Sequence, residues 1–72
     1  MVNLKKFAER LKEYMNDNGQ NATSLAEIIN SNRTSIAEYV RGVRLPSASV
    51  FFAMLNYFKC SADFLLGLTD ST

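Results

Sequence analysis

Apolar residues recur three or four positions apart along most of the chain, and this spacing predicts helices rather than strands. In the first such segment Asn3 can act as an N-cap. Asn18-Gly19 can end the helix, because glycine adopts the left-handed C-cap conformation without steric cost. The charged residues in between are interpreted as a solvated face. The apolar positions of this first predicted helix are Leu4, Phe7, Ala8, Leu11, Tyr14 and Met15.

Two shorter helices are predicted between Asn21 and Arg41, joined by a polar turn at residues 30–32. Asn21 can cap the first of them and Asn32 the second, which spans roughly residues 33–41. Asparagine suits the turn because it tolerates the left-handed backbone region. Two helices joined in this way form a helix-turn-helix, whose second helix is a probe for the major groove of DNA. The residues expected to face the core are Leu25, Ala26, Ile28, Ile29, Ile36, Tyr39 and Val40.

Two further helices follow a rigid loop. Gly42 ends the probe helix, and Pro46 keeps the residue before it out of helical angles. Ser47 can cap a fourth helix of about residues 48–58, and Ser61 can cap a fifth that Gly67 ends. The whole pattern predicts an all-α fold. It is a compact five-helix bundle that forms a single domain over residues 1–68, with residues 69–72 as a C-terminal tail.

The composition fits a soluble globular domain and offers few groups for catalysis or metal binding. The chain has 72 residues, of which 47% are apolar and 21% charged, so there is room for one small core. It has no His and a single cysteine, Cys60, so neither a disulfide scaffold nor a zinc finger is available, and we expect no metal or cofactor. No run of about 18 apolar residues occurs, so we expect a cytoplasmic protein that does not span a membrane.

Positive charge is concentrated around the predicted probe helix. The formal net charge is only +1, from 8 Lys and Arg against 7 Asp and Glu. Residues 30–47, however, contain Arg33, Arg41 and Arg44 against Glu38 alone. Because clustered cations attract phosphate, this local excess favours a nucleic-acid interface more than the net charge does.

Five short motifs carry a family resemblance: Leu25-Ala26-Glu27, Ile36, Arg41-Gly42, Pro46-Ser47 and the run from Ser61 to Gly67. With them the chain resembles, over nearly its whole length, the phage Cro and repressor type of helix-turn-helix DNA-binding domain, also called lambda-repressor-like. Such domains are five-helix bundles that usually bind operator DNA as dimers. The resemblance therefore implies double-stranded DNA and a second copy of the chain as partners.

Three departures from that family's usual pattern affect the interpretation. Ala22 stands where a Gln usually contacts the DNA backbone, and Asn30 stands where the turn usually has Gly. Met15 and Val40 stand where many members have an Arg and a Glu that form an ion pair. Replacing both partners of a buried pair with apolar groups is often neutral or stabilising, whereas losing one strands a charge. We therefore predict that Met15 and Val40 touch in the core.

The outward face of the predicted probe helix carries the residues expected to read bases. An Arg at position 33 can donate two hydrogen bonds to guanine O6 and N7, worth about 1–3 kcal/mol of discrimination. Glu38 can accept from cytosine N4, but an exposed Glu is more often solvated or paired with a neighbouring Arg. The base-reading candidates are Arg33, Thr34, Ser35, Ala37 and Glu38.

Phosphate contacts are expected around the ends of the two motif helices and in the loop after the probe, because free backbone N–H groups point outward at helix N-termini. Arg41 has an alternative role, which is to complement the C-terminus of its own helix. The phosphate-contacting candidates are Asn21, Thr23, Asn32, Arg41, Arg44 and Ser47.

A set of apolar residues outside the main apolar face of the fourth helix and around the fifth is open to two interpretations. In the first they form an exposed patch that serves as a dimer interface. In the second the short fifth helix covers them, as expected in so small a domain. The residues are Phe52, Tyr57, Leu66 and Leu68.

Two functions are weighed against each other. The favoured one is a sequence-specific DNA-binding transcriptional regulator that docks two probe helices as a dimer. The alternative is a helix-turn-helix fold that acts mainly as a protein-interaction module, suggested by the low net charge, Ala22 and the acidic Glu38. An enzyme is not expected, because the chain has no His, no glycine-rich phosphate loop and no carboxylate cluster at ligand spacing.

Overall fold

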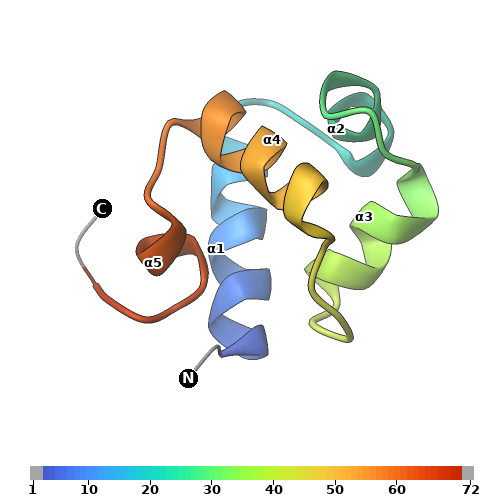
Figure 1. The fold of residues 1–72 in the computed structure, drawn as a ribbon. Coiled ribbons are helices and arrows are strands. Elements are labelled where there is room, and N and C mark those ends of the chain that lie inside the picture. The colour runs from blue at the N-terminus through green and yellow to red at the C-terminus, as the bar shows by residue number, and fades with distance from the viewer. Residues whose placement is uncertain (1–2, 71–72) are drawn as a thin grey trace.

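Five helices and no strand make up residues 3–70, the part of the chain that the computed structural model describes (Figure 1). This confirms the predicted all-α five-helix bundle, and the predicted helix ends agree with the observed ones to within about one residue. The helices are α1 (Leu4–Asp17), α2 (Ala22–Ile28), α3 (Arg33–Val40), α4 (Ala48–Phe58) and α5 (Ala62–Leu65).

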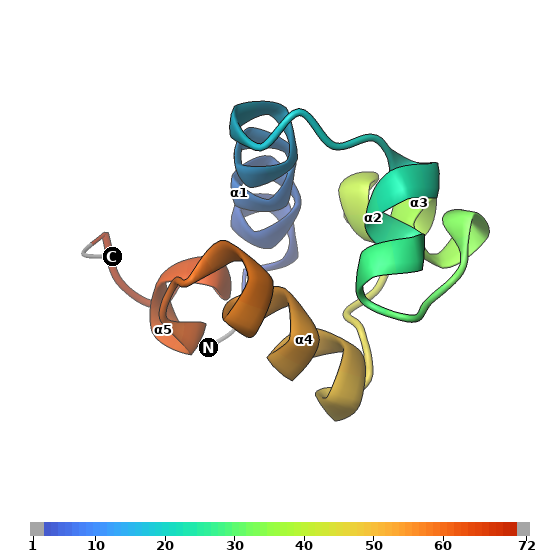
Figure 2. The ribbon, with the colours of Figure 1, turned by 90° about the horizontal axis from the view of Figure 1, so that it is seen from above.

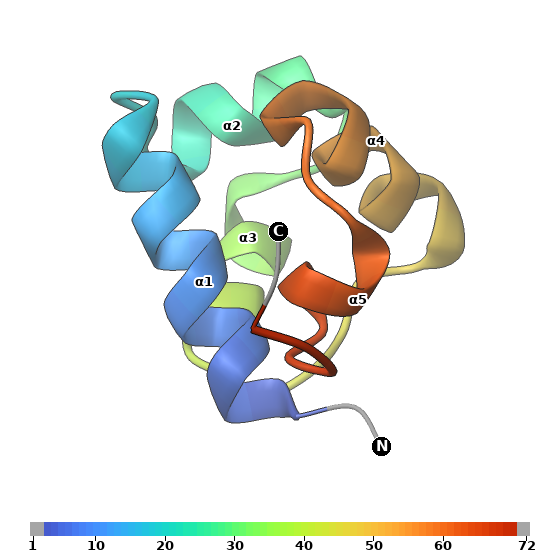
Figure 3. The same cartoon turned by 90° about the vertical axis from the view of Figure 1, so that its left-hand side faces the viewer.

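Helix α1 lies between α3 and α5 in the bundle. It packs against α3 on one side and α5 on the other, and α2 packs closely on α3. Seen from above, α4 lies across the core from α1 (Figure 2). The view in Figure 3 places α1 and α5 side by side, with α3 behind them. Helix α3 is thus supported from behind, while its other side faces away from the bundle.

Every helix contributes at least one fully buried side chain to a single core. These anchors are large and apolar, and burying each one stabilises the fold by roughly 1.5–3 kcal/mol relative to leaving it exposed. Helix α3, with only eight residues, is therefore held by the shared core rather than by its own helix propensity. The fully buried side chains are Phe7, Leu11, Leu25, Ile36, Met54 and Leu65.

Side-chain caps fix the beginnings of four helices. The side-chain oxygens of Asn3, Asn21, Asn32 and Ser61 each accept a hydrogen bond from the backbone N–H three residues later. Ser47 occupies the N-cap position of α4 but makes no such bond, and its hydroxyl lies 3.4 Å from that of Ser49 instead. The predicted N-cap position of Ser47 is therefore confirmed, although its side chain makes no capping hydrogen bond. Pro46, which restricts the chain just before α4, fixes the entry instead.

The turn between α2 and α3 confirms the prediction for Asn30. Its φ is 55°, in the left-handed region that favours glycine and that asparagine tolerates. The Ser31 N–H donates to the Ala26 carbonyl over 2.8 Å, which closes the C-terminus of α2. The substitution of Asn for the usual Gly thus leaves the turn intact.

Residue Ile28 is more exposed than expected. The buried side chains of α2 and its C-cap are Leu25, Ala26 and Ile29, whereas Ile28 is 47% exposed. At 100° per residue the three buried positions define one face, and Ile28 falls more than a quarter turn away from its centre. The prediction that Ile28 faces the core is therefore wrong.

Met15 and Val40 both take part in the apolar core. Met15 belongs to the buried core cluster and Val40 packs partly buried against that cluster. Both apolar replacements therefore sit where the core can accept them. Direct contact between the two side chains stays a prediction.

Residues 69 and 70, expected to form a tail, are bound to α1 by Arg10. The guanidinium of Arg10 donates to the carbonyls of Phe64 and Thr69 and to the Asp70 carboxylate, the last over 2.9 Å. It also lies 4.0 Å from the centre of the Phe64 ring. Arg10, interpreted from the sequence as part of a solvated face, is instead largely buried. Residues 69 and 70 are thus held against α1, while the boundary of the domain stays a prediction and the last two residues lie outside the described range.

Candidate nucleic-acid interface

Helix α3 has one buried and one outward face. Ile36 and Tyr39 are buried in the core, while Arg33, Thr34 and Arg41 are exposed. Ala37 and Glu38 are partly exposed and lie on the same helical face as the three exposed residues, one turn apart along the axis. Four of the five predicted base readers thus share the outward face of α3.

The fifth predicted reader, Ser35, is placed differently. Only 9% of it is exposed, and its Oγ accepts a hydrogen bond from Arg44 Nη2 over 2.8 Å. Around the helix axis, position 35 lies at a smaller angle from the buried positions 36 and 39 than from positions 33 and 37. Ser35 therefore lies at the edge of the core. Its predicted place among the outward base readers is therefore wrong.

Arg44 is folded back onto α3 rather than extended from the loop. Its Nε lies 2.8 Å from Glu38 Oε1, in addition to the bond from Nη2 to Ser35. The guanidinium carbon also lies 5.3 Å from the centre of the Tyr39 ring, within the range of a cation–π contact. Glu38 is thus paired with a neighbouring Arg in the structure, and its contact with cytosine stays a prediction. Helical periodicity could not predict the pairing of Glu38 with Arg44, because the helix ends before Gly42 and the chain changes direction between them.

The other two arginines on this side differ from Arg44. Within residues 3–70, Arg33 and Arg41 form no ion pair with a carboxylate. Both side chains are exposed, Arg33 in the first turn of α3 and Arg41 at its C-cap. They are therefore the cations of this surface that are most accessible to an anion.

The polar candidates at the helix starts are exposed, and two of them are partly committed to the fold. Asn21 and Asn32 use Oδ1 to accept from Ser24 and Ser35 N–H, both over 2.8 Å. The cap uses only the acceptor, so the amide nitrogen of each Asn keeps its donor capacity. Thr23 and Ser47 are also exposed.

The four apolar residues considered for a dimer interface do not behave alike. Phe52 is 64% exposed and Leu68 is also exposed. Tyr57 is half-buried, accepts a hydrogen bond from Gln20 Nε2 over 3.1 Å and packs on Phe58 with ring centres 5.1 Å apart. Leu66 is half-buried in the turn after α5. Tyr57 and Leu66 are thus only partly accessible, whereas Phe52 and Leu68 are exposed, and a role of these residues in a dimer interface stays a prediction.

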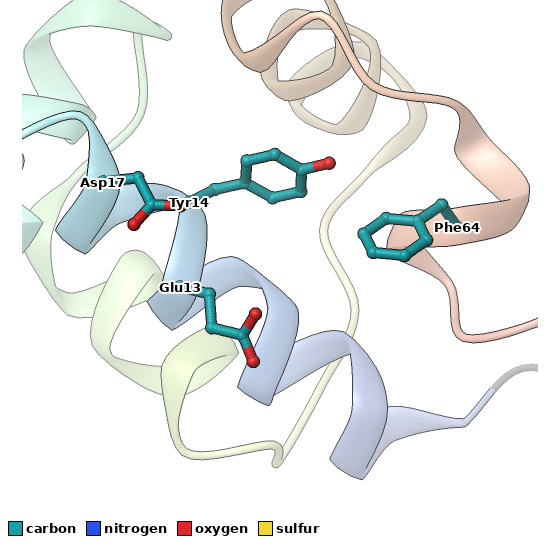
Figure 4. Close-up of a pocket in the computed structure, with 4 residues that line it drawn as sticks. All are labelled: Glu13, Tyr14, Asp17 and Phe64. Atoms are coloured by element: carbon teal, nitrogen blue, oxygen red, sulfur yellow. The ribbon is translucent and has the colours of Figure 1, made fainter. Parts of the chain in front are cut away.

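A shallow pocket of about 220 Å³ lies between α1 and α5, on the side of α1 away from α3 (Figure 4). It is lined by Glu13, Tyr14, Asp17 and Phe64. Nearby, burial raises the pKa of the Cys60 thiol above its ordinary value of 9.0, so the thiol stays protonated at neutral pH. Among residues 3–70 no group of three His, Cys, Asp or Glu side chains could hold a metal ion.

The fold, the turn and the outward polar face of α3 together define a helix-turn-helix domain. A family model described as helix-turn-helix matches residues 11–65, and the chain belongs to this family, in its Cro and repressor type. Neither the curated proteins nor the solved structures gave a match. The family is typically one of DNA-binding transcription regulators and is not an enzyme family. Within residues 3–70, no helix is long and apolar enough to cross a membrane.

Proposed function

We propose that this chain is a sequence-specific DNA-binding transcriptional regulator that inserts α3, about residues 33–41, into the major groove. The observation that carries the proposal is the two-sidedness of α3. Ile36 and Tyr39 anchor one face in the core, and the opposite face presents polar and cationic side chains. A rigidly held helix with such a face matches the docking of helix-turn-helix domains in general.

The side chains of this surface suit different parts of a DNA duplex. Arg33 can form a bidentate pair with guanine, and Thr34 can bond a base edge beside it. Ala37 offers a small apolar contact for a thymine methyl group. Arg41 suits phosphate, which positions the protein without carrying sequence information.

The helix starts add weaker, uncharged contacts. The amide nitrogens of Asn21 and Asn32 and the hydroxyls of Thr23 and Ser47 can each donate to a phosphate oxygen. Ala22 supplies no such donor, so the start of α2 binds the backbone less strongly than a Gln there would allow.

The active form is proposed to be a homodimer that places two copies of α3 in successive major grooves. One copy contributes three arginines to the proposed DNA-binding surface, namely Arg33, Arg41 and Arg44, and the last of these is paired with Glu38. Two copies double the number of phosphate contacts and read twice as many base pairs. Phe52 and Leu68, the exposed members of the apolar set, are the candidate contacts between copies.

A second function is favoured by one observation. The ion pair between Arg44 and Glu38 reduces the positive charge available to phosphate, as a protein-interaction module with weak or no DNA binding would tolerate. The unpaired state of Arg33 and Arg41 within residues 3–70 supports DNA binding instead.

The test is a fluorescence-anisotropy titration with random duplex DNA over a salt series, followed by selection of bound sequences from a random library. We expect binding to random duplex at low salt, and a selected site that Arg33→Ala weakens by about 1–3 kcal/mol while relaxing one base position. The control is Lys59→Asn, which removes one positive charge at the end of α4 and keeps a residue that tolerates the left-handed φ of 58°. Absence of binding to random duplex at low salt would overturn the proposal, since phosphate contacts alone give affinity there.

A further inference from the structure

We propose that Glu38 restrains Arg44 in the unbound protein and thereby weakens its binding to DNA of arbitrary sequence. Glu38 thus acts by suppressing a phosphate contact. The inference rests on the proposed DNA-binding function. It concerns a pair that lies on the proposed DNA-binding surface, yet joins two residues that were each predicted to contact DNA by themselves.

Three contacts hold Arg44 against α3. Nε is paired with Glu38 Oε1 over 2.8 Å, Nη2 donates to Ser35 Oγ over 2.8 Å, and the guanidinium lies above the Tyr39 ring. Ser35 and Tyr39 are themselves buried, so they hold the guanidinium in a fixed position. Of the three partners only Glu38 is charged.

The pair is exposed enough to exchange partners. The side chain of Arg44 is 50% exposed and that of Glu38 is 36% exposed. Such pairs are weak in water, and an Arg guanidinium donates to phosphate oxygens in the same geometry as to a carboxylate. A DNA phosphate that binds Arg44 through Nε must therefore displace Glu38, which leaves an unpaired carboxylate on the outward face of α3 beside the negatively charged duplex.

This displacement lowers affinity for every sequence alike, because it concerns the phosphate backbone. Binding to arbitrary DNA consists almost entirely of such contacts, whereas binding to a selected site also includes base contacts from Arg33 and its neighbours. The same loss of binding free energy is therefore a larger fraction of the weaker non-specific binding, while the ratio of the two affinities stays the same. The pair thus keeps the affinity of this surface for arbitrary DNA low.

The experiment compares wild type, Glu38→Gln, Arg44→Gln and the double variant on a random-sequence duplex between 50 and 200 mM salt. One added phosphate contact steepens the slope of log K against log salt by about 0.9, which equals an about 3.5-fold larger gain at 50 mM than at 200 mM. We expect Glu38→Gln to bind more tightly than wild type with this steeper slope. We expect the gain to shrink strongly when Arg44→Gln is already present.

Two further variants isolate the pair from general charge effects. Glu27→Gln removes one exposed carboxylate of α2 that forms no ion pair within residues 3–70, so it reports the effect of net charge alone. Glu38→Ala removes the acceptor entirely, and it should release Arg44 as Glu38→Gln does. Thermal unfolding of each variant checks that the fold is intact.

The possible outcomes separate the inference from the proposed function. If wild type binds random duplex and Glu38→Gln binds no better than Glu27→Gln, or gains as much without Arg44, the restraint does not exist. If Glu38→Gln binds at 50 mM salt and wild type does not, the restraint by Glu38 is supported, but the proposed DNA binding of the wild-type chain is refuted. If neither protein binds at 50 mM salt, DNA binding itself is refuted and the inference with it.

Discussion

A single methyl group at position 67 should destabilise this domain far more than its size suggests. Gly67 follows α5 with φ = +77°, and a Cβ built there would lie 2.7 Å from Lys6 Cβ and 3.3 Å from Asn3 Cβ. The left-handed conformation costs an L-residue about 1–2 kcal/mol. The near atom is a Cβ close to the α1 backbone, so relieving the overlap requires a backbone shift, which costs about 1–3 kcal/mol more.

The expected total for Gly67→Ala is therefore about 2–5 kcal/mol, a large part of the roughly 4–11 kcal/mol that stabilises a domain of this length. At about 4–8 °C per kcal/mol, the midpoint of thermal unfolding should fall by at least about 8 °C. Circular dichroism at 222 nm during heating measures this shift directly.

Gly19→Ala is the matched control. Gly19 has a φ of +64°, so alanine there meets the same backbone penalty, but nothing lies within 4 Å of the added Cβ. Its loss should be limited to about 1–2 kcal/mol. Equal losses in the two variants would refute the steric argument, because only the contact with α1 distinguishes them.

Three further predictions concern α1 and its partners. Arg10→Met should cost about 1–3 kcal/mol in unfolding free energy, because the carbonyls it bonds lose their donor in a part-buried site; an unchanged urea midpoint would contradict this. Lys6 first and Arg10 second lower the pKa of Asp70 below its ordinary value of 3.8, so Asp70 adds stability above that pH and loses it as pH falls through the lower folded-state pKa. The difference in unfolding midpoint between wild type and Asp70→Asn should thus be full at pH 7 and vanish in strong acid; a difference that grows in acid would contradict the sign. Met15→Glu should destabilise by several kcal/mol, and adding Val40→Arg should recover part of the loss if the two positions touch, whereas strictly additive losses would place them apart.

The helices were predictable because their signals are local. Asparagine and serine caps, glycine stops and apolar spacing each act within a few residues, and the observed caps of Asn3, Asn21, Asn32 and Ser61 follow them. The left-handed turn at Asn30 was predictable for the same reason. At Ser47, where the side chain makes no capping hydrogen bond, the preceding proline already restricts the chain.

The residues whose surroundings were predicted wrongly either have a long side chain or lie at the boundary between two faces of a helix. Arg10 reaches residues 54 to 60 positions away in the chain, and no helical period reports a contact at that separation. Ser35 and Ile28 lie at the boundary between two faces, where a small shift in helix rotation decides burial. The pairing of Arg44 with Glu38 depends on how the chain reverses after Gly42, which the one-dimensional pattern does not contain. The fold was thus easier to predict than the chemistry of its surface.

The way all five helices share one core also affects how binding data on this protein should be interpreted. Helix α3 is too short to be stable outside the folded domain, so the fraction of molecules able to bind DNA equals the fraction that is folded. A cavity at Met54, on the distant α4, would lower the apparent affinity near the unfolding midpoint for selected and random sequences by the same factor. The ratio of the two affinities would not change. That ratio, rather than affinity alone, distinguishes a residue that reads DNA from one that only keeps the reading helix folded.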